Sequence, residues 1–213
     1  MKIIFCNIAY MKYYKGIIEG IDEPENGGQY VKVYKNAHEA YNFDAIECQE
    51  TENEMCLGYV RLSQSSENKT SEFHIEKING CEHMEKEPYI DDVTVVWCAK
   101  SNRIDGMRVV GWYTNATALR NPEFAEFENG FVQEYNFFAE KTSCVLLPEK
   151  ERYLAKWIVP RSGHNGYDFG FGRSNIWYAQ GSEINSKQKT YIETILKQIN
   201  NYNGENWIEK KAD

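Results

Sequence analysis

Three short segments place aromatic rings beside small polar side chains, which is the chemistry of a pocket for a flat ligand. Trp97 lies near the end of an apolar run, the segment 112–115 (WYTN) ends a second one, and the segment 174–178 (SNIWY) follows a glycine-rich stretch. Stacking of a nucleobase on an aromatic ring contributes roughly 1–3 kcal/mol. An asparagine amide both donates and accepts hydrogen bonds, as reading the edge of a base requires. The pattern predicts a cage for an extruded base or another flat ligand.

Core packing is the competing explanation for these rings. Neighbouring residues on a strand face opposite ways, so each of the pairs Trp112/Tyr113 and Trp177/Tyr178 is expected to send one ring inward and one outward. Both explanations stay open at the level of the sequence.

Common catalytic and metal-binding motifs are absent from the sequence. The four histidines, at 38, 74, 83 and 164, lack metal-ligand spacing, and there is no phosphate-binding loop and no GxSxG element. The run 170–172 (GFG) leads into a strand-like segment, whereas a dinucleotide fingerprint opens a helix. Cys6, Cys98 and Cys144 lie in apolar runs, as inert core thiols do. We therefore expect a binding protein with no catalytic residue, no metal and no cofactor.

Apolar runs of strand length dominate the chain. The clearest are 93–99 and 107–113, which a polar turn separates, and they predict an antiparallel hairpin in the core. Further strands are expected at 2–9, 29–34, 56–62, 73–78, 143–147, 153–159 and 174–179. Residues 183–202 switch to a helical period, with Ser182 as N-cap and Gly204 as the stop. The expected fold is α+β: a mixed, mostly antiparallel β-barrel of about six strands with flanking helices and a C-terminal helix.

Charge is distributed unevenly along the 213 residues, whose net charge is −8. Residues 19–92 hold 18 Asp/Glu and 6 Lys/Arg, a balance of −12, and the remainder holds 14 and 18, a balance of +4. This argues against a protein that coats nucleic acid indiscriminately, but a mildly basic surface outside the acidic stretch suits local phosphate contacts.

The sequence predicts a cytoplasmic protein without a membrane partner. No apolar stretch approaches the length of a membrane span, and the N-terminus lacks the pattern of a secretion signal. The six cysteines include no CxxC pair and are expected to be reduced thiols.

Two central motifs carry a resemblance to a known superfamily. The segment 90–100 (IDDVTVVWCAK), a polar turn and the segment 108–122 (RVVGWYTNATALRNP) resemble the central hairpin of EVE-type and YTH-type domains of the PUA-like superfamily. The opening 3–14 (IIFCNIAYMKYY) is similar in position to their first strand. Together with VLLP, IVPR and GFGRSNIWYA, these motifs also look like modules at the N-termini of modification-dependent restriction endonucleases.

The resemblance implies a base-recognition domain at 1–180, with an acidic insert near 44–90 that has no counterpart, and a C-terminal helix and linker at 181–213. It implies non-catalytic recognition of a modified cytosine or methyladenine in DNA, or of a modified base in RNA, flipped into an aromatic cage. The effector would be a fused or associated restriction nuclease of a host-defence system.

The resemblance also implies site residues. Those expected at the base are Asn7, Ala9, Tyr10, Trp97, Trp112 or Tyr113, and Asn115. Ser174, Asn175 and Trp177 are added from their sequence motif alone. Arg120, Arg161 and Arg173 adjoin the motifs and are expected to contact phosphates.

Two other classes of function remain open. The same aromatic surface would suit another flat ligand or a protein partner. A metal-dependent nuclease using Asp91 and Asp92 is the third alternative, and it predicts magnesium-dependent cleavage by the isolated chain.

Overall fold

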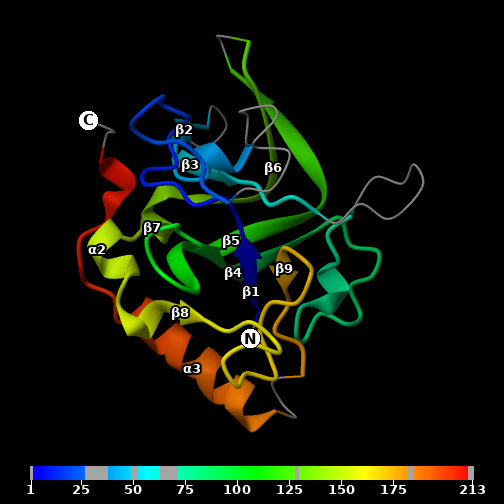
Figure 1. Ribbon diagram of the computed structural model, residues 1–213. Helices are drawn as coiled ribbons and strands as arrows, with labels where there is room; N and C mark the ends of the chain where they lie inside the picture. Colours follow the sequence, from blue (N-terminus) through cyan, green and yellow to red (C-terminus); the bar gives the residue numbers. More distant parts are fainter. Residues whose placement is uncertain are drawn as a thin grey trace.

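One mixed β-sheet dominates the computed structural model, which describes residues 2–26, 38–48, 52–62, 72–127, 130–181 and 185–210 (Figure 1). Its nine strands are β1 (Ile3–Asn7), β2 (Ala45–Glu47), β3 (Glu54–Gly58), β4 (Tyr89–Ala99), β5 (Met107–Glu126), β6 (Val132–Glu140), β7 (Cys144–Leu146), β8 (Ile158–Val159) and β9 (Ile176–Trp177). The helical segments are η1 (His38–Tyr41), η2 (Ile75–Lys77), η3 (Lys141–Ser143), α2 (Glu149–Arg152), η4 (Ala155–Trp157), α3 (Ser186–Asn200) and η5 (Trp207–Glu209). The α+β class is confirmed.

The strand order is β2-β3-β6-β5-β4-β1-β9, with β7 and β8 also pairing with β5. The predicted central hairpin is confirmed, because β4 pairs antiparallel with β5. Of the pairings between these strands only β1 with β4 is parallel. The prediction of a closed barrel is not met: the sheet is open, and within the described residues its end strands β2 and β9 each pair with one neighbour.

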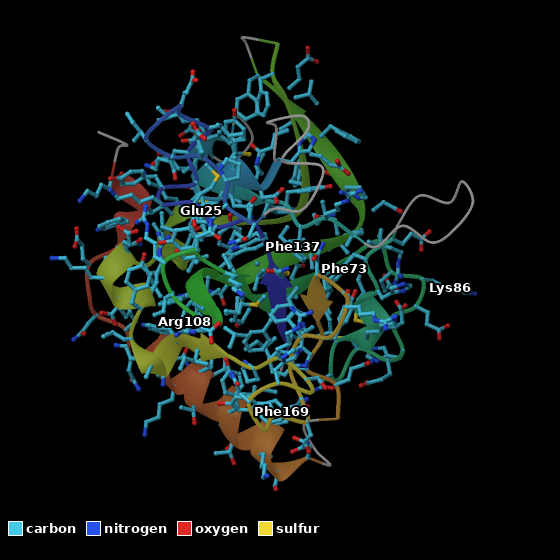
Figure 2. The ribbon with its side chains drawn as sticks, viewed as in Figure 1. Glu25, Phe73, Lys86, Arg108, Phe137 and Phe169 are labelled. Atoms are coloured by element: carbon cyan, nitrogen blue, oxygen red, sulfur yellow. The ribbon has the colours of Figure 1, made fainter. Side chains whose placement is uncertain are left out.

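The sheet buries an apolar cluster on each of its two faces. Along β4, Val95 and Trp97 belong to the first core, whereas Val96 and Cys98 belong to the second. This is the two-residue alternation of a strand that is covered on both sides. Phe73 and Phe137 meet edge to face in the first core, with ring centroids 5.2 Å apart (Figure 2).

Helix α3 covers the second core. Ile192, Ile195 and Ile199 recur at helical spacing and are buried there, close to Phe169 (Figures 1 and 2). The expected C-terminal helix is thus confirmed with shorter bounds. Its N-cap is Asn185, whose side chain accepts hydrogen bonds from the N–H groups of Lys187 and Gln188 at 3.1 Å. Ser182, the expected N-cap, lies outside the described residues, as does the strand expected at 29–34.

Two predicted strands need correction, and one strand was not predicted. The segment 73–78 contains the 3₁₀ helix η2 (Ile75–Lys77) instead of a strand, because Ile75 and Ile78, three residues apart, bury the same face of a tight turn. Most of 153–159 is turn and 3₁₀ helix, and only its last two residues pair as β8. Strand β6 was not predicted, because the polar residues Gln133 and Asn136 are buried in it and obscure its alternation.

Candidate functional site: a polar junction between β1 and β9

Two of the rings expected to form the cage are core residues on the first face. Trp97 has no exposed surface, and its ring packs edge to face against Tyr113 and Phe137, at centroid distances of 5.3 and 5.7 Å. Tyr113 is equally buried, and its hydroxyl donates to the carbonyl of Asn42. Burial raises the pKa of this phenol well above its ordinary value. Neither ring is available as a wall of an open cage.

The other two rings lie in the second core, on the opposite face of the sheet. Trp112 stacks on Trp157 with centroids 5.4 Å apart. Trp177 stacks on Phe5 at 4.4 Å with an interplanar angle of 25°, and only 8% of its surface is exposed. Trp112 and Trp177 thus pack on other rings, and Tyr113 faces the other side of the sheet, so a base held between Trp177 and Trp112 or Tyr113 would have to displace these contacts.

The polar residues that were predicted next to these strands do meet. Asn7 ends β1 and Asn175 precedes β9, and the two are 168 positions apart in the chain. The Asn7 N–H donates to the Asn175 carbonyl at 2.7 Å, and the Asn7 side-chain amide donates to Asn175 Oδ1 at 3.3 Å. Both side chains are half-buried. The β1–β9 pairing thus forms a pair of adjacent amides, which we call the amide junction.

Polar groups from two further segments lie around the amide junction. The Asn175 Nδ2 donates to the Arg61 carbonyl at 3.1 Å. Ser174 is exposed, and its hydroxyl accepts from the Ile176 N–H at 3.1 Å. Arg61 and Ser174 therefore join the junction from the segment that follows β3 and from the turn before β9.

The chain leaving β1 passes near the Glu39 carboxylate of η1. Burial raises the pKa of Glu39, and its own N–H and the N–H of Ala9, a predicted site residue that is itself buried, oppose that rise. The Arg61 guanidinium also acts on the Glu39 charge. Sequence reasoning missed both Glu39 and Arg61, since no motif marks either residue.

Tyr10 points away from the amide junction. Its hydroxyl lies 3.4 Å from both Glu149 Oε1 and the Tyr153 hydroxyl, and its ring lies 5.5 Å from the Arg152 guanidinium. Tyr10 is buried, which raises the pKa of its phenol. It joins α2 to the first strand instead of facing a ligand beside Asn7.

Two buried charges fix the turn that follows Tyr10. The Asp22 carboxylate accepts from the N–H groups of residues 12, 13 and 14 at 2.6, 2.8 and 3.2 Å. From the other side, the Arg152 guanidinium donates to the carbonyls of Met11 and Lys12 at 2.7 Å. Buried charges that are hydrogen-bonded to backbone groups in this way rigidify the backbone, so residues 11–14 are held in one conformation.

The three arginines predicted to bind phosphate divide into two groups. Arg120 is buried, and its guanidinium donates to Glu76 Oε2 at 2.9 Å and to the carbonyls of Glu87 and Met84 at 2.8 and 2.7 Å. These partners occupy the guanidinium, so a phosphate would have to displace them to contact Arg120. Arg161 and Arg173 are exposed, and Arg173 lies two residues before Asn175.

Asn115 lies apart from the other site residues. It is exposed at an irregularity of the β4–β5 pairing and has φ +50°, while Asp92 on β4 has φ +60°. Asn and Asp tolerate this left-handed conformation better than other side chains do. The structure thus gives Asn115 a role in bending the hairpin.

A cavity of about 540 Å³ lies between η4 and the C-terminal end of α3. It is lined by Trp157, Tyr202, Gln198 and other residues, none of which was predicted. Within the described ranges, no three His, Cys, Asp or Glu residues gather as a metal site would require. The same residues include no helix with the length and apolarity needed to cross a bilayer.

Comparison with known proteins gave no relative: no family model matches the chain, and neither the curated proteins nor the solved structures contain a significant match.

Proposed function

We propose that this chain is a non-catalytic module that recognises a modified nucleobase, flipped out of DNA, at the amide junction. The base would be a modified cytosine or a methyladenine. The proposal includes kinship with PUA-like base readers, cytoplasmic action, and a restriction nuclease, fused or associated, as the effector.

The adjacent side chains of Asn7 and Asn175 are the observation that carries this proposal. Asn7 Oδ1 has no hydrogen-bond partner among the described residues, and its Nδ2 is shared with Asn175 Oδ1 alone. A half-buried carbonyl beside a half-buried amide can accept from, and donate to, the edge of one planar ring. Modified bases differ from unmodified ones in their edges and volume, so such a pair suits discrimination between them.

Charge around the junction supports a nucleic-acid ligand. Arg173 is exposed beside Asn175, and Arg161 is exposed on the strand-like segment that bridges to Phe171. Exposed guanidinium groups near a base site position a phosphate backbone. The net charge of −8 keeps sequence-independent binding weak.

The alternative functions have less support. The aromatic surface proposed for another flat ligand or a protein partner is buried, as described above. For a nuclease, the Asp91 carboxylate accepts from the Thr117 hydroxyl at 2.6 Å, and the described residues offer it no cluster of metal ligands. Base recognition uses the polar groups that the fold does bring together.

Binding of short duplexes tests the proposal. Duplexes carrying methylated or hydroxymethylated cytosine, methyladenine or unmodified bases would be titrated with the wild type and with Asn7→Ala. We expect one modified duplex to bind best, and Asn7→Ala to weaken it by about tenfold or more, since a good base contact is worth roughly 1–3 kcal/mol. The matched control is Asn53→Ala. Asn53 is exposed, directly precedes β3 at the far end of the strand order from β9, and donates its side-chain amide to Glu140. Equal binding of all duplexes, or equal loss in both variants, would contradict the proposal.

A further inference from the structure

The distal half of the β5–β6 hairpin extends beyond the rest of the sheet (Figure 1). Four residue pairs continue the ladder there, from Glu123 with Tyr135 to Glu126 with Val132. An irregularity between Ala118 and Glu123 separates this part from the pairs inside the sheet. The extension is thus a two-stranded arm joined to the core at a bend.

One side of this arm presents apolar groups to solvent. Residues directly opposite on paired strands point to the same face, so Phe124 and Glu134 share a face with Glu126 and Val132. We call these four residues the hairpin face. Phe124 is 65% exposed and Val132 43% exposed, and they are two of the five large apolar side chains most open to solvent among the described residues.

The opposite side of the arm is fixed to the protein. Gln133 is buried and donates to the Leu57 carbonyl at 2.9 Å, which ties the arm to β3. Phe131 packs on Tyr41 of η1 with ring centroids 4.5 Å apart. These contacts hold the hairpin face outward in one orientation, which lowers the entropy lost on binding.

The charge of the arm selects the class of partner. Residues 121–140 contain five Glu and no Lys, Arg or Asp. Glu126 and Glu134 flank the two apolar side chains on the hairpin face itself. Such a surface repels phosphate backbones and attracts protein surfaces rich in Lys and Arg.

We propose that the hairpin face docks a protein partner whose surface has an apolar socket for the Phe124 ring, surrounded by Lys and Arg side chains. Binding hot spots are typically anchors that fill a pocket on the partner and are surrounded by contacts that exclude water, while complementary charge adds specificity. Val132 widens the apolar contact, and Glu126 and Glu134 pair with the basic rim. This surface is separate from the amide junction, so the inference does not depend on base recognition.

A defined probe tests this surface without knowledge of the natural partner. The probe is a ten-residue peptide of alternating Leu and Lys, compared with the same peptide carrying Glu in place of Lys. Binding to the full chain is measured by calorimetry and mapped by NMR. We expect the Lys peptide to bind, with shifts centred on the arm, and Phe124→Ser to weaken binding at least tenfold.

Ile21→Ser is the matched control, because Ile21 is 47% exposed but lies outside the arm. It should leave the affinity for the Lys peptide unchanged. Equal weakening by both variants, equal binding of the Glu peptide, or shifts spread over the acidic stretch 19–92 would overturn the proposal. It would also be overturned if Phe124→Ser weakened binding of a DNA duplex and not of the Lys peptide, because the arm would then contact nucleic acid.

Discussion

The amide junction and the aromatic core beneath the central hairpin differ in how fully the protein itself engages their side-chain groups. In the core, Trp97 and Tyr113 are enclosed by other rings, and the Tyr113 hydroxyl is occupied by a backbone carbonyl. At the junction, Asn7 and Asn175 are half-buried, and Asn7 Oδ1 lacks a partner among the described residues. The aromatic residues thus form the hydrophobic core, whereas the amide junction keeps a hydrogen-bonding atom, Asn7 Oδ1, that the described residues leave unused.

The largest expected effect is a loss of stability when a ring is removed from the hydrophobic core. Trp177→Ala removes a ring that stacks on Phe5 at 4.4 Å, and should lower the free energy of unfolding by about 3–5 kcal/mol. Denaturant unfolding measures this loss. Trp177→Phe, which keeps a ring on Phe5, is the control and should lose less. If Trp177→Ala keeps the stability of the wild type but no longer binds a modified duplex, the Trp177 ring contacts the base and the prediction of a core role is wrong.

A smaller effect concerns the ion pair of Glu76 with Arg120. Burial acts to raise the pKa of Glu76, but hydrogen bonds from its own N–H, from Arg120 and from His74 outweigh it, so the pKa lies below its ordinary value of 4.5. A lowered pKa stabilises the fold above the unfolded-state value, and this contribution disappears as pH falls through the folded-state value.

Glu76→Gln should therefore reduce stability near neutral pH by about 1 kcal/mol or less, as for a partly exposed pair. It should also flatten the decline in stability as pH falls below the ordinary glutamate pKa of 4.5. Unfolding by urea at several pH values measures both effects, with the exposed Glu85 changed to Gln as the control. An identical pH profile for Glu76→Gln and the wild type would refute the ion pair's contribution.

The smallest expected effect is on the salt dependence of duplex binding, when Arg173 beside the amide junction is replaced. Arg173→Ala should weaken modified and unmodified duplexes alike and reduce the slope of log affinity against log salt by about one, because one phosphate contact is lost. Lys86→Ala, far from β9, should leave the slope unchanged (Figure 2). Loss of discrimination between the two duplexes, without a change of slope, would assign Arg173 to the base instead.

The sequence predicted the main strands and the C-terminal helix better than it predicted the candidate site. Runs of apolar residues at 93–99 and 107–113 are long enough to dictate a buried hairpin, and the helical spacing of Ile192, Ile195 and Ile199 dictates α3. Closure of the sheet was not predictable, because it depends on whether β2 and β9 meet, and no local pattern encodes that contact. The buried polar residues of β6 likewise made a strand that periodicity alone does not reveal.

Of the predicted site residues, Asn7 came from the family resemblance and Asn175 from its sequence motif. Asn7 ends β1 and Asn175 directly precedes β9, and polar residues at strand ends are free to face outward. The neighbouring Trp177 was assigned to the site because it is adjacent in sequence, but strand alternation and the ring of Phe5 bury it. Arg120 was assigned to phosphate binding because it adjoins the central motif, and only the structure shows that Glu76 and two carbonyls already bind its guanidinium.

Side-chain amide NMR tests the central claim most directly. Modified duplex is added to ¹⁵N-labelled protein, and the side-chain NH₂ signals of Asn7, Asn175 and Asn53 are followed. We predict that the signals of Asn7 and Asn175 shift with the modified duplex and not with the unmodified one, while Asn53 stays unchanged. Unshifted Asn7 and Asn175 signals on binding, with changes at the cavity residues Gln198 and Asn201 instead, would contradict the account.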